Sequence, residues 1–228
     1  MARAVVFDLG GVVVRICRSW EEACARAGVE WKTGVMDPAR MAERKGIHRE
    51  YERGGMGCGE FFERIAGTTG GLYSAEEFAR VHEAWLIGEY AGVGELVGEL
   101  HDAGVVTGVL SNTNASHWRV LTGTGGLGGV GGGGRAGGEE NAAQFPTARR
   151  VRHLHASHLL GHAKPDAAIY RAFEERSGVR GGEILFFDDL EENVVGARGC
   201  GWGGHRVDPL GDPGVEMRGV LRRLGILR

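Results

Sequence analysis

Polar side chains follow two short apolar runs of the sequence, at the points where strands would end. Asp8 comes directly after residues 4–7 and precedes a pair of glycines. Ser111 and Asn112 come directly after residues 105–110. A carboxylate in such a position can act as a nucleophile or bind a metal ion. A hydroxyl, an amide and backbone N–H groups suit an anionic oxygen.

A lysine and two further carboxylates extend this set. Lys164 precedes a helix that begins with proline, and its ammonium group would neutralise a phosphate and hold Asp8 ionised. Asp188 and Asp189 follow the apolar run 184–187. Mg²⁺ takes carboxylate oxygens at near-octahedral geometry, with water and substrate oxygens completing its shell. Each of these features is common in proteins when taken alone.

The elements that must position these residues alternate between strand and helix. Apolar residues recur at helical spacing between and after the strands, at Val93, Leu96, Val97 and Leu100 and at Ala168, Ile169, Ala172 and Phe173. The alternation predicts an α/β fold, with a parallel sheet flanked by helices on both faces. Ligands of such sheets bind at the carboxyl ends of the strands, where the polar residues stand.

The segment 16–92 differs from the rest because it contains several helix starts and no convincing strand. Ser19 and Ser74 each stand three residues before a glutamate, which is the spacing of a capping box. We therefore expect a small helical domain at 16–92, inserted into a core formed by residues 1–15 and 93–228.

Four motifs, taken in order, resemble those of the haloacid dehalogenase superfamily of phosphohydrolases. They are FDLGGV at 7–12, LSNTN at 110–114, KPD with IY at 164–170, and FFDDLEEN with GA at 186–197. The motifs span essentially the whole chain. The resemblance implies a Rossmann-like core with a helical cap inserted after the first motif, and it is strongest to small sugar-phosphate phosphatases.

The resemblance also implies a role for each residue around the phosphate. Asp8 would be the nucleophile and would form an aspartyl-phosphate intermediate. Ser111 and Asn112 would bind the phosphoryl oxygens. Lys164 would hold both these oxygens and Asp8.

A second group of residues is implied as the metal site. Asp8, Asp188 and the backbone carbonyl of Gly10 would bind Mg²⁺, with Asp189 as an alternative or outer ligand. Asn193 stands where the family often has an acidic residue, so it is a candidate for supporting these ligands.

Gly10 departs from the pattern of the family's phosphatases. They usually place a second aspartate two residues after the nucleophile as general acid and base, a role worth about 10² to 10⁴ in rate. Here another residue or water supplies the proton, the substrate has a good leaving group, or the protein is slow. The sequence leaves these three possibilities open.

Three functions fit these residues to different degrees. The leading one is a Mg²⁺-dependent hydrolase of phosphoric monoesters, acting on a small phosphorylated metabolite such as a sugar phosphate. A metal-independent 2-haloacid dehalogenase also uses an aspartate nucleophile and lacks the second aspartate, but carboxylates at Asp188 and Asp189 would repel a halocarboxylate. A protein that binds a phosphorylated ligand without turnover would be consistent with Gly10.

Other features of the sequence indicate no further site. The glycine-rich segment 123–145 matches the dinucleotide pattern G-x-G-x-x-G without a preceding strand, and we expect a flexible surface loop within the core. Four histidines near each other in sequence are expected to be solvated or partly packed rather than metal ligands: His153, His155, His158 and His162.

Composition excludes several classes of partner. The 27 Lys and Arg against 30 Asp and Glu give a net charge of −3, which argues against a polybasic nucleic-acid binder. No apolar run approaches the length of a membrane span, and the 4 cysteines form no C-x-x-C pair. We expect a cytoplasmic protein whose partner is a small phosphorylated substrate, with neither nucleic acid nor membrane.

Overall fold

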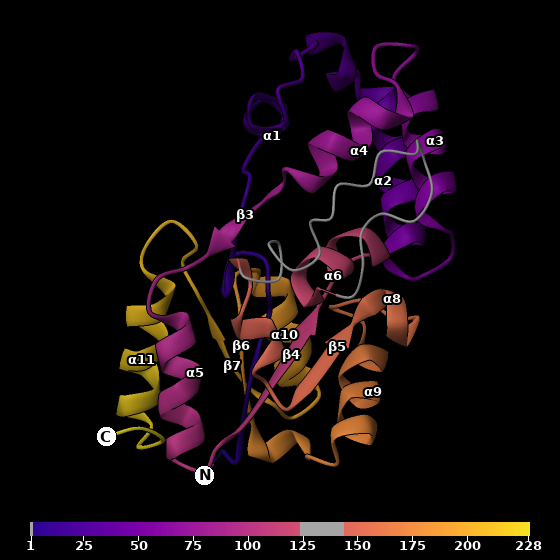
Figure 1. The fold of residues 1–228 in the computed structure, drawn as a ribbon. Coiled ribbons are helices and arrows are strands. Elements are labelled where there is room, and N and C mark those ends of the chain that lie inside the picture. Colours follow the sequence, from indigo (N-terminus) through magenta and orange to yellow (C-terminus); the bar gives the residue numbers. More distant parts are fainter. Residues whose placement is uncertain (1, 124–143) are drawn as a thin grey trace.

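The computed structural model describes residues 2–123 and 144–228, and in them a parallel sheet lies between helices (Figure 1). Its five strands lie in the order β5-β4-β1-β6-β7, and neighbouring strands are parallel. The bounds are β1 (Ala4–Phe7), β4 (Val106–Ser111), β5 (His153–Ala156), β6 (Ile184–Asp188) and β7 (Gly203–Arg206). The α/β fold class predicted from the sequence is confirmed.

Helices cover both faces of this sheet. They are α5 (Val93–Asp102), α6 (Ala115–Thr122), α8 (Ser157–Leu160), α9 (Ala167–Ser177), α10 (Glu191–Gly199) and α11 (Pro213–Arg223), with the 3₁₀ turns η2 (Thr147–Arg149) and η3 (Gly181–Glu183). Side chains alternate across a strand, so Val5 and Phe7 pack with α5 and α11 while Ala4 and Val6 pack with α9 and α10. Figure 1 shows α5 and α11 side by side on one flank and α9 on the other.

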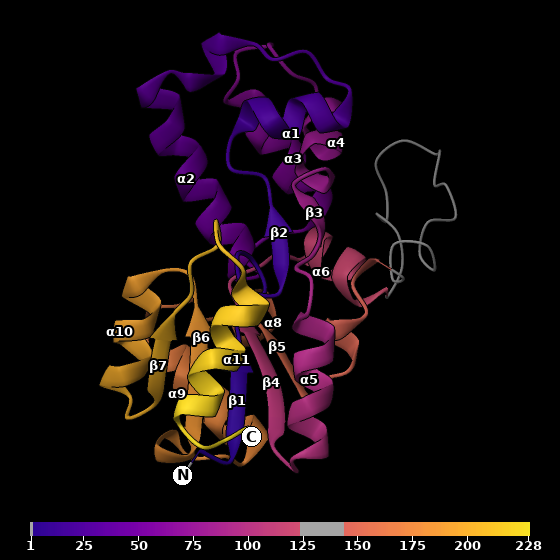
Figure 2. The ribbon, with the colours of Figure 1, turned by 90° about the vertical axis from the view of Figure 1, so that its left-hand side faces the viewer.

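A second group of elements, called the cap below, lies above the carboxyl ends of the strands (Figures 1 and 2). It contains β2 (Val14–Ile16), α1 (Trp20–Ala27), η1 (Thr33–Met36), α2 (Pro38–Glu52), α3 (Cys58–Gly67), α4 (Ala75–Glu83) and β3 (Leu86–Glu89). Its helices enclose an apolar core of their own, built around Phe61, Ile65 and Phe78, none of which is more than 1% exposed.

The cap contains one expected feature, a capping box at Ser74, and one unexpected feature, a pair of strands. Ser74 caps α4 as expected, because its hydroxyl accepts from Glu77 N and its own N–H donates to Glu77 Oε2. The expectation that 16–92 holds no strand was wrong, since β3 pairs antiparallel with β2. This pairing joins the start and the end of the segment, and local apolar periodicity cannot report a pairing between such distant residues.

The sequence analysis also expected a flexible loop at 123–145 and no membrane span. Most of the glycine-rich segment 123–145 lies outside the described residues. Among the described helices, none combines the length and the apolar character that a membrane span requires.

Candidate active site

Asp8 and Asp188 stand side by side at the carboxyl edge of the sheet. Phe7, the last residue of β1, is in register with Phe187 of β6, so the residues that follow are neighbours. The Asp8 N–H donates to the Phe187 carbonyl at 2.8 Å, which fixes the backbone at this point. Both carboxylates are buried, with 8% of Asp8 and 0% of Asp188 exposed. Two buried carboxylates whose oxygens lie within 4.8 Å of each other require a positive charge between them.

Lys164 supplies that charge. Its Nζ lies 2.9 Å from Asp8 Oδ1 and 2.6 Å from Asp188 Oδ2, and its side chain is fully enclosed. Burial alone would lower the pKa of Lys164, but the charges of Asp8 and Asp188 outweigh it and raise the pKa. Burial and the charge of Asp188 raise the pKa of Asp8, and Lys164 opposes both. The lysine therefore stays charged and holds the two carboxylates in place.

Further donors fix the orientation of Asp188. Its Oδ1 accepts from Leu190 N at 2.9 Å, and Asn193 Nδ2 lies 3.0 Å from Oδ1 and 3.1 Å from Oδ2. Asn193 is held in turn by the Tyr170 hydroxyl, which donates to its backbone carbonyl at 2.7 Å. Asn193 thus reaches the carboxylate of Asp188 as a neutral hydrogen-bond donor.

Ser111 and Asn112 approach from β4, on the other side of β1. The Ser111 hydroxyl donates to Asp8 and lowers its pKa. The Asn112 amide is occupied by the backbone of Lys164: Oδ1 accepts from Lys164 N at 2.8 Å, and Nδ2 donates to Lys164 O at 2.9 Å. The Lys164 carbonyl takes one of the two N–H groups of Nδ2, so Asn112 can offer a phosphoryl oxygen its backbone N–H and the second N–H of its amide.

A possible metal site is formed by three carboxylates. One oxygen from each of Asp8, Asp188 and Asp189 lies within 4.8 Å of the others. Gly11 has φ of +82°, and a Cβ built on it would lie 2.5 Å from Asp189 Oδ2, so only glycine lets the turn approach this carboxylate. Hard oxygen donors gathered at one point fit Mg²⁺. The four histidines at 153–162 are absent from the potential metal groups found among the described residues.

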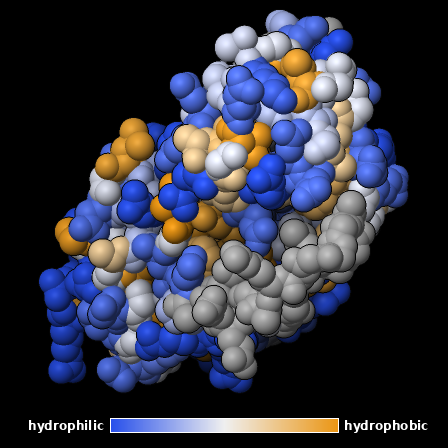
Figure 3. All heavy atoms as spheres, turned by 45° about the horizontal axis from the view of Figure 1, so that its top comes forward, coloured by the Kyte–Doolittle hydropathy of each residue, from blue (hydrophilic) through white to orange (hydrophobic). Residues whose placement is uncertain are grey.

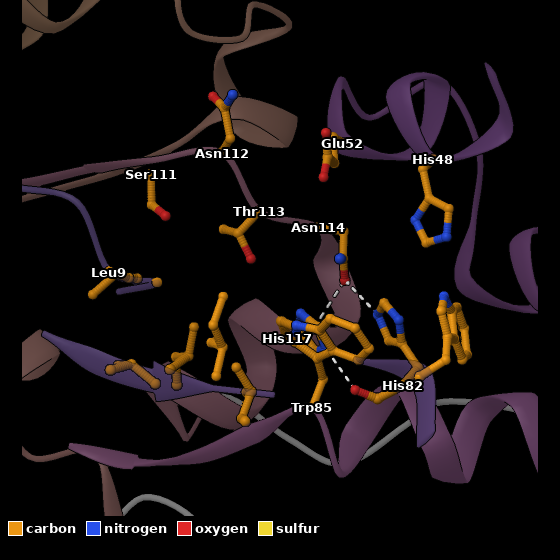
Figure 4. A pocket seen from close by; sticks show the side chains of 16 residues that line it. Leu9, His48, Glu52, His82, Trp85, Ser111, Asn112, Thr113, Asn114 and His117 are labelled. Atoms are coloured by element: carbon orange, nitrogen blue, oxygen red, sulfur yellow. Dashed lines mark hydrogen bonds between the residues drawn. The ribbon is translucent and has the colours of Figure 1, made fainter. Parts of the chain in front are cut away.

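A pocket of about 350 Å³ opens beside these residues, between the core and the cap. The core lines it with Gly10, Ser111, Asn112, Asn114 and His117 among others, and the cap with Trp20, His48, Glu52, His82 and Trp85. Figure 4 shows the side chains of the cap and of the strand ends facing the same space. In the face that Figure 3 presents, apolar residues gather where the cap meets the core.

Hydrogen bonds decide the tautomers of two pocket histidines. His117 Nε2 lies 2.7 Å from the His82 carbonyl, which can only accept, so His117 carries its proton on Nε2. Asn114 Oδ1 accepts from the backbone N–H of His117, and His82 Nε2, 3.3 Å from the same oxygen, must therefore donate to it. The two rings stack with centroids 3.9 Å apart (Figure 4).

These histidines are neutral near pH 7. Burial lowers the pKa of His48 and of His117 to about 4, and it lowers the pKa of His82 well below its ordinary value. They offer a ligand hydrogen-bond donors and acceptors, together with two tryptophans, but no positive charge. The anionic part of a ligand is thus attracted to Lys164 rather than to the histidines.

The family follows from a match along most of the chain. A family profile described as haloacid dehalogenase-like hydrolase matches residues 2–201. The chain belongs to this family. The hydrolase is 26% identical over 197 residues to the D-ribitol-5-phosphate phosphatase of Bacteroides thetaiotaomicron, covering 85% of this chain and 86% of that protein. It is 40% identical over 72 residues to Phosphatase MT3486 of Mycobacterium tuberculosis, and spans only 32% of that protein's length.

Solved structures share the fold of this hydrolase. A HAD family enzyme of Bacteroides thetaiotaomicron, crystallised as a magnesium complex, superposes with a TM-score of 0.73 at 22% identity, over 95% of this chain and 98% of that one. The L-2-haloacid dehalogenase of Xanthobacter autotrophicus is more distant, with a TM-score of 0.54 at 22% identity over 96% and 83% of the two chains.

The structure gathers the polar site residues of the motifs at the carboxyl edge of the sheet: Asp8, Ser111, Asn112, Lys164, Asp188 and Asp189. What sequence reasoning missed is the part of the pocket made by His48, Glu52, His82 and His117. The first three belong to cap helices and show no motif. One feature of the sequence could have marked His82. It shares the buried face of α4 with the apolar Phe78 and Val81, and it is only 6% exposed itself.

Proposed function

We propose that this hydrolase is a Mg²⁺-dependent phosphatase of small phosphorylated metabolites, working through an aspartyl-phosphate on Asp8. The observation that carries the proposal is the buried contact of Lys164 with both Asp8 and Asp188. A carboxylate nucleophile can approach an anionic phosphate only where positive charge offsets the repulsion. This site has one lysine for three carboxylates, and a divalent cation would balance the remaining negative charge.

The residues of the chain have separate tasks in this reaction. A carboxylate oxygen of Asp8 attacks phosphorus and forms the aspartyl-phosphate as the bond to the leaving group breaks. The Ser111 hydroxyl and the backbone N–H of Asn112 donate to the phosphoryl oxygens. Lys164 neutralises charge on these oxygens and keeps Asp8 in line.

The metal would be held by Asp8, Asp188, Asp189 and the backbone carbonyl of Gly10. When bound, Mg²⁺ polarises the phosphoryl group and reduces the repulsion between it and the carboxylates. Asn193 and Leu190 keep Asp188 oriented for this task, since both donate to its carboxylate.

The pocket supports a hydroxylated organic part for the substrate. Neutral histidines and Asn114 suit hydroxyl groups, which both donate and accept hydrogen bonds. The two tryptophans suit the C–H faces of a sugar or polyol. The similarity to a D-ribitol-5-phosphate phosphatase agrees with this choice and makes sugar and polyol phosphates the first substrates to test.

Gly10 favours two other functions. A 2-haloacid dehalogenase needs no acid at this position, but three carboxylates beside one lysine would repel its halocarboxylate substrate. A protein that binds a phosphorylated ligand without hydrolysing it would explain Gly10, but it would have no need of Asp8 as a nucleophile.

Phosphate release separates the three functions. We would assay p-nitrophenyl phosphate and a panel of sugar and polyol phosphates, with Mg²⁺ and with chelator, for wild type and Asp8→Asn. We expect turnover that requires Mg²⁺ and is lost in Asp8→Asn, while thermal unfolding shows both proteins folded. Chloride release from a 2-haloacid in chelator would establish the dehalogenase. Thermal stabilisation by phosphorylated ligands without any turnover would establish the binding protein.

A further inference from the structure

The reaction proposed above needs a proton donor that Gly10 does not provide. When an alkyl phosphate transfers its phosphoryl group, the departing oxygen carries negative charge unless it receives a proton. Within residues 2–123 and 144–228, the titratable side chains that line the pocket are His48, Glu52, His82 and His117. The lowered pKa of each histidine leaves it neutral at pH 7, and a neutral imidazole is a poor acid. A carboxyl group, Glu52, remains.

Glu52 is fixed over the site by its neighbours in the chain. It is the last residue of α2, and the residues around it contact the core. Tyr51 accepts the backbone N–H of Ser116 at 3.0 Å. Arg53 forms a 2.6 Å ion pair with Asp166, close after Lys164 in sequence. These contacts hold the end of the cap helix against the core, so Glu52 keeps its place above the strand ends.

The carboxyl group of Glu52 lines the pocket and is close enough to Asp8 and Lys164 to interact with both electrostatically. It has no hydrogen bond or ion pair with the part of the chain that the structure describes. Figure 4 shows it extending from the cap into the space bordered by Ser111, Thr113 and Asn114. Gly10 lines the same pocket, so Glu52 borders the cavity beside the position where the second aspartate is missing.

We propose that Glu52 is the general acid and base of this hydrolase, acting from the cap in place of a side chain at position 10. The assignment rests on the phosphatase function proposed above and adds to it the group that moves the proton. It makes the cap part of the catalytic machinery as well as a wall of the pocket.

The proton is conserved over the two steps. In the first, Asp8 attacks phosphorus, the bond from phosphorus to the leaving oxygen breaks, and that oxygen takes the proton of Glu52 to give an alcohol. In the second, water attacks phosphorus and gives one proton to the Glu52 carboxylate as the bond to Asp8 breaks. Inorganic phosphate, the Asp8 carboxylate and protonated Glu52 are restored.

The charges around Glu52 suit this role. Burial raises its pKa above the ordinary value, and the negative charge of Asp8 raises it further. Arg49 and Arg53, on its own segment, and Lys164, from the core, oppose this shift. His48, which lies one turn before Glu52 on α2 and lines the same pocket, is neutral because burial lowers its pKa. A carboxyl group of raised pKa keeps more of its protonated form near neutral pH, as an acid must.

The test is the dependence of kcat/KM on the leaving group. We would compare Glu52→Gln with wild type on p-nitrophenyl phosphate, whose leaving group needs no proton, and on an alkyl phosphate such as a polyol phosphate. We expect a loss of about 10² to 10⁴ on the alkyl phosphate and at most a few-fold on the aryl one. Glu43→Gln, an exposed change on the same helix, serves as the matched control and should behave as wild type.

A second variant guards against an indirect effect. A Cβ on Gly10 would meet only Ile16, at 3.4 Å, so the backbone at this position has room for a side chain and Gly10→Asp is the second variant. Added to Glu52→Gln, it should restore at least tenfold of the lost kcat/KM on the alkyl phosphate. An equal loss on both substrates, or no loss on the alkyl phosphate, would overturn the assignment to Glu52. Absence of turnover by wild type on both substrates would instead refute the phosphatase function itself.

Discussion

The side-chain amide of Asn112 is bound at both ends by the backbone of Lys164. Oδ1 accepts the Lys164 N–H at 2.8 Å, and Nδ2 donates to the Lys164 carbonyl at 2.9 Å. This closed pair joins the end of β4 to the loop that delivers the ammonium group to Asp8. Asn112 therefore acts on the chemistry mainly through the position of Lys164.

Replacing Asn112 by alanine removes both hydrogen bonds from the Lys164 backbone. We expect kcat/KM for a phosphate monoester to fall about 10- to 100-fold, as for other groups that orient a reacting residue. Unfolding free energy should fall by about 1–3 kcal/mol, because backbone groups of Lys164 lose their partner. In a Lys164→Met background the same change should have little further effect on kcat/KM. Additive losses in that double-mutant cycle would show that Asn112 acts independently.

Replacing Lys164 by methionine leaves Asp8 and Asp188 buried without a cation. Removing one partner of a buried ion pair costs about 3–5 kcal/mol, so we expect a large fall in stability without metal. We expect kcat to fall by at least about 10² to 10³, the range for losing one group that stabilises transition-state charge. Added Mg²⁺ should recover part of the lost stability and none of the activity. Denaturant unfolding with and without Mg²⁺ measures the recovered stability, and phosphate release measures the activity.

The sheet and its edge could be predicted because each signal is local. Asp8, Ser111 and Asp188 each end a short apolar run, and parallel strands bring such ends to one edge. Gly11 belongs to the pair of glycines that follows Asp8 in the sequence, and only the structure shows that it makes room for Asp189.

The cap's share of the site could not be predicted because it depends on how two units meet. Glu52 is the last residue of α2, and nothing in the sequence of this helix marks it. Its position over the strand ends depends on the contacts of Tyr51 and Arg53 with the core. His82 carries no motif, and its role follows only from its contacts with Asn114 and His117. The strand β3 was missed for the same reason, since it forms only where the chain returns to β2.

Substituting Gly11 by alanine tests the metal site through its packing. The new Cβ would lie 2.5 Å from Asp189 Oδ2, and the backbone φ of +82° is unfavourable for alanine. We expect a stability loss of about 1–2 kcal/mol from the conformation alone. The displaced carboxylate should weaken Mg²⁺ binding about 10- to 100-fold, measured by titration calorimetry. Gly28→Ala, also at positive φ but with no neighbour within 4 Å, should lower stability and leave Mg²⁺ affinity unchanged.

The buried histidines should make stability rise with pH between about 4 and 6.5. The pKa of His117 is lowered to about 4 in the folded protein, whereas a free histidine titrates near 6.5. In this window the unfolded chain binds more protons, so the free energy of unfolding increases with pH, by up to about 1.4 kcal/mol per pH unit for each histidine. The raised pKa of Asp8, about 6, has the opposite sign, because the folded protein then binds more protons between about 4 and 6.

Saturating Mg²⁺ separates these two contributions, since a bound cation keeps Asp8 ionised across the window. Under that condition we would follow denaturant unfolding from pH 4.5 to pH 7 for wild type, His117→Gln and Trp85→Phe. The glutamine side chain can still donate to the His82 carbonyl but cannot titrate, so the slope should fall by about one proton. Trp85→Phe alters the same pocket without changing a titratable group and should keep the wild-type slope. Equal slopes for wild type and His117→Gln would mean that His117 is protonated as readily in the folded protein as in the unfolded chain.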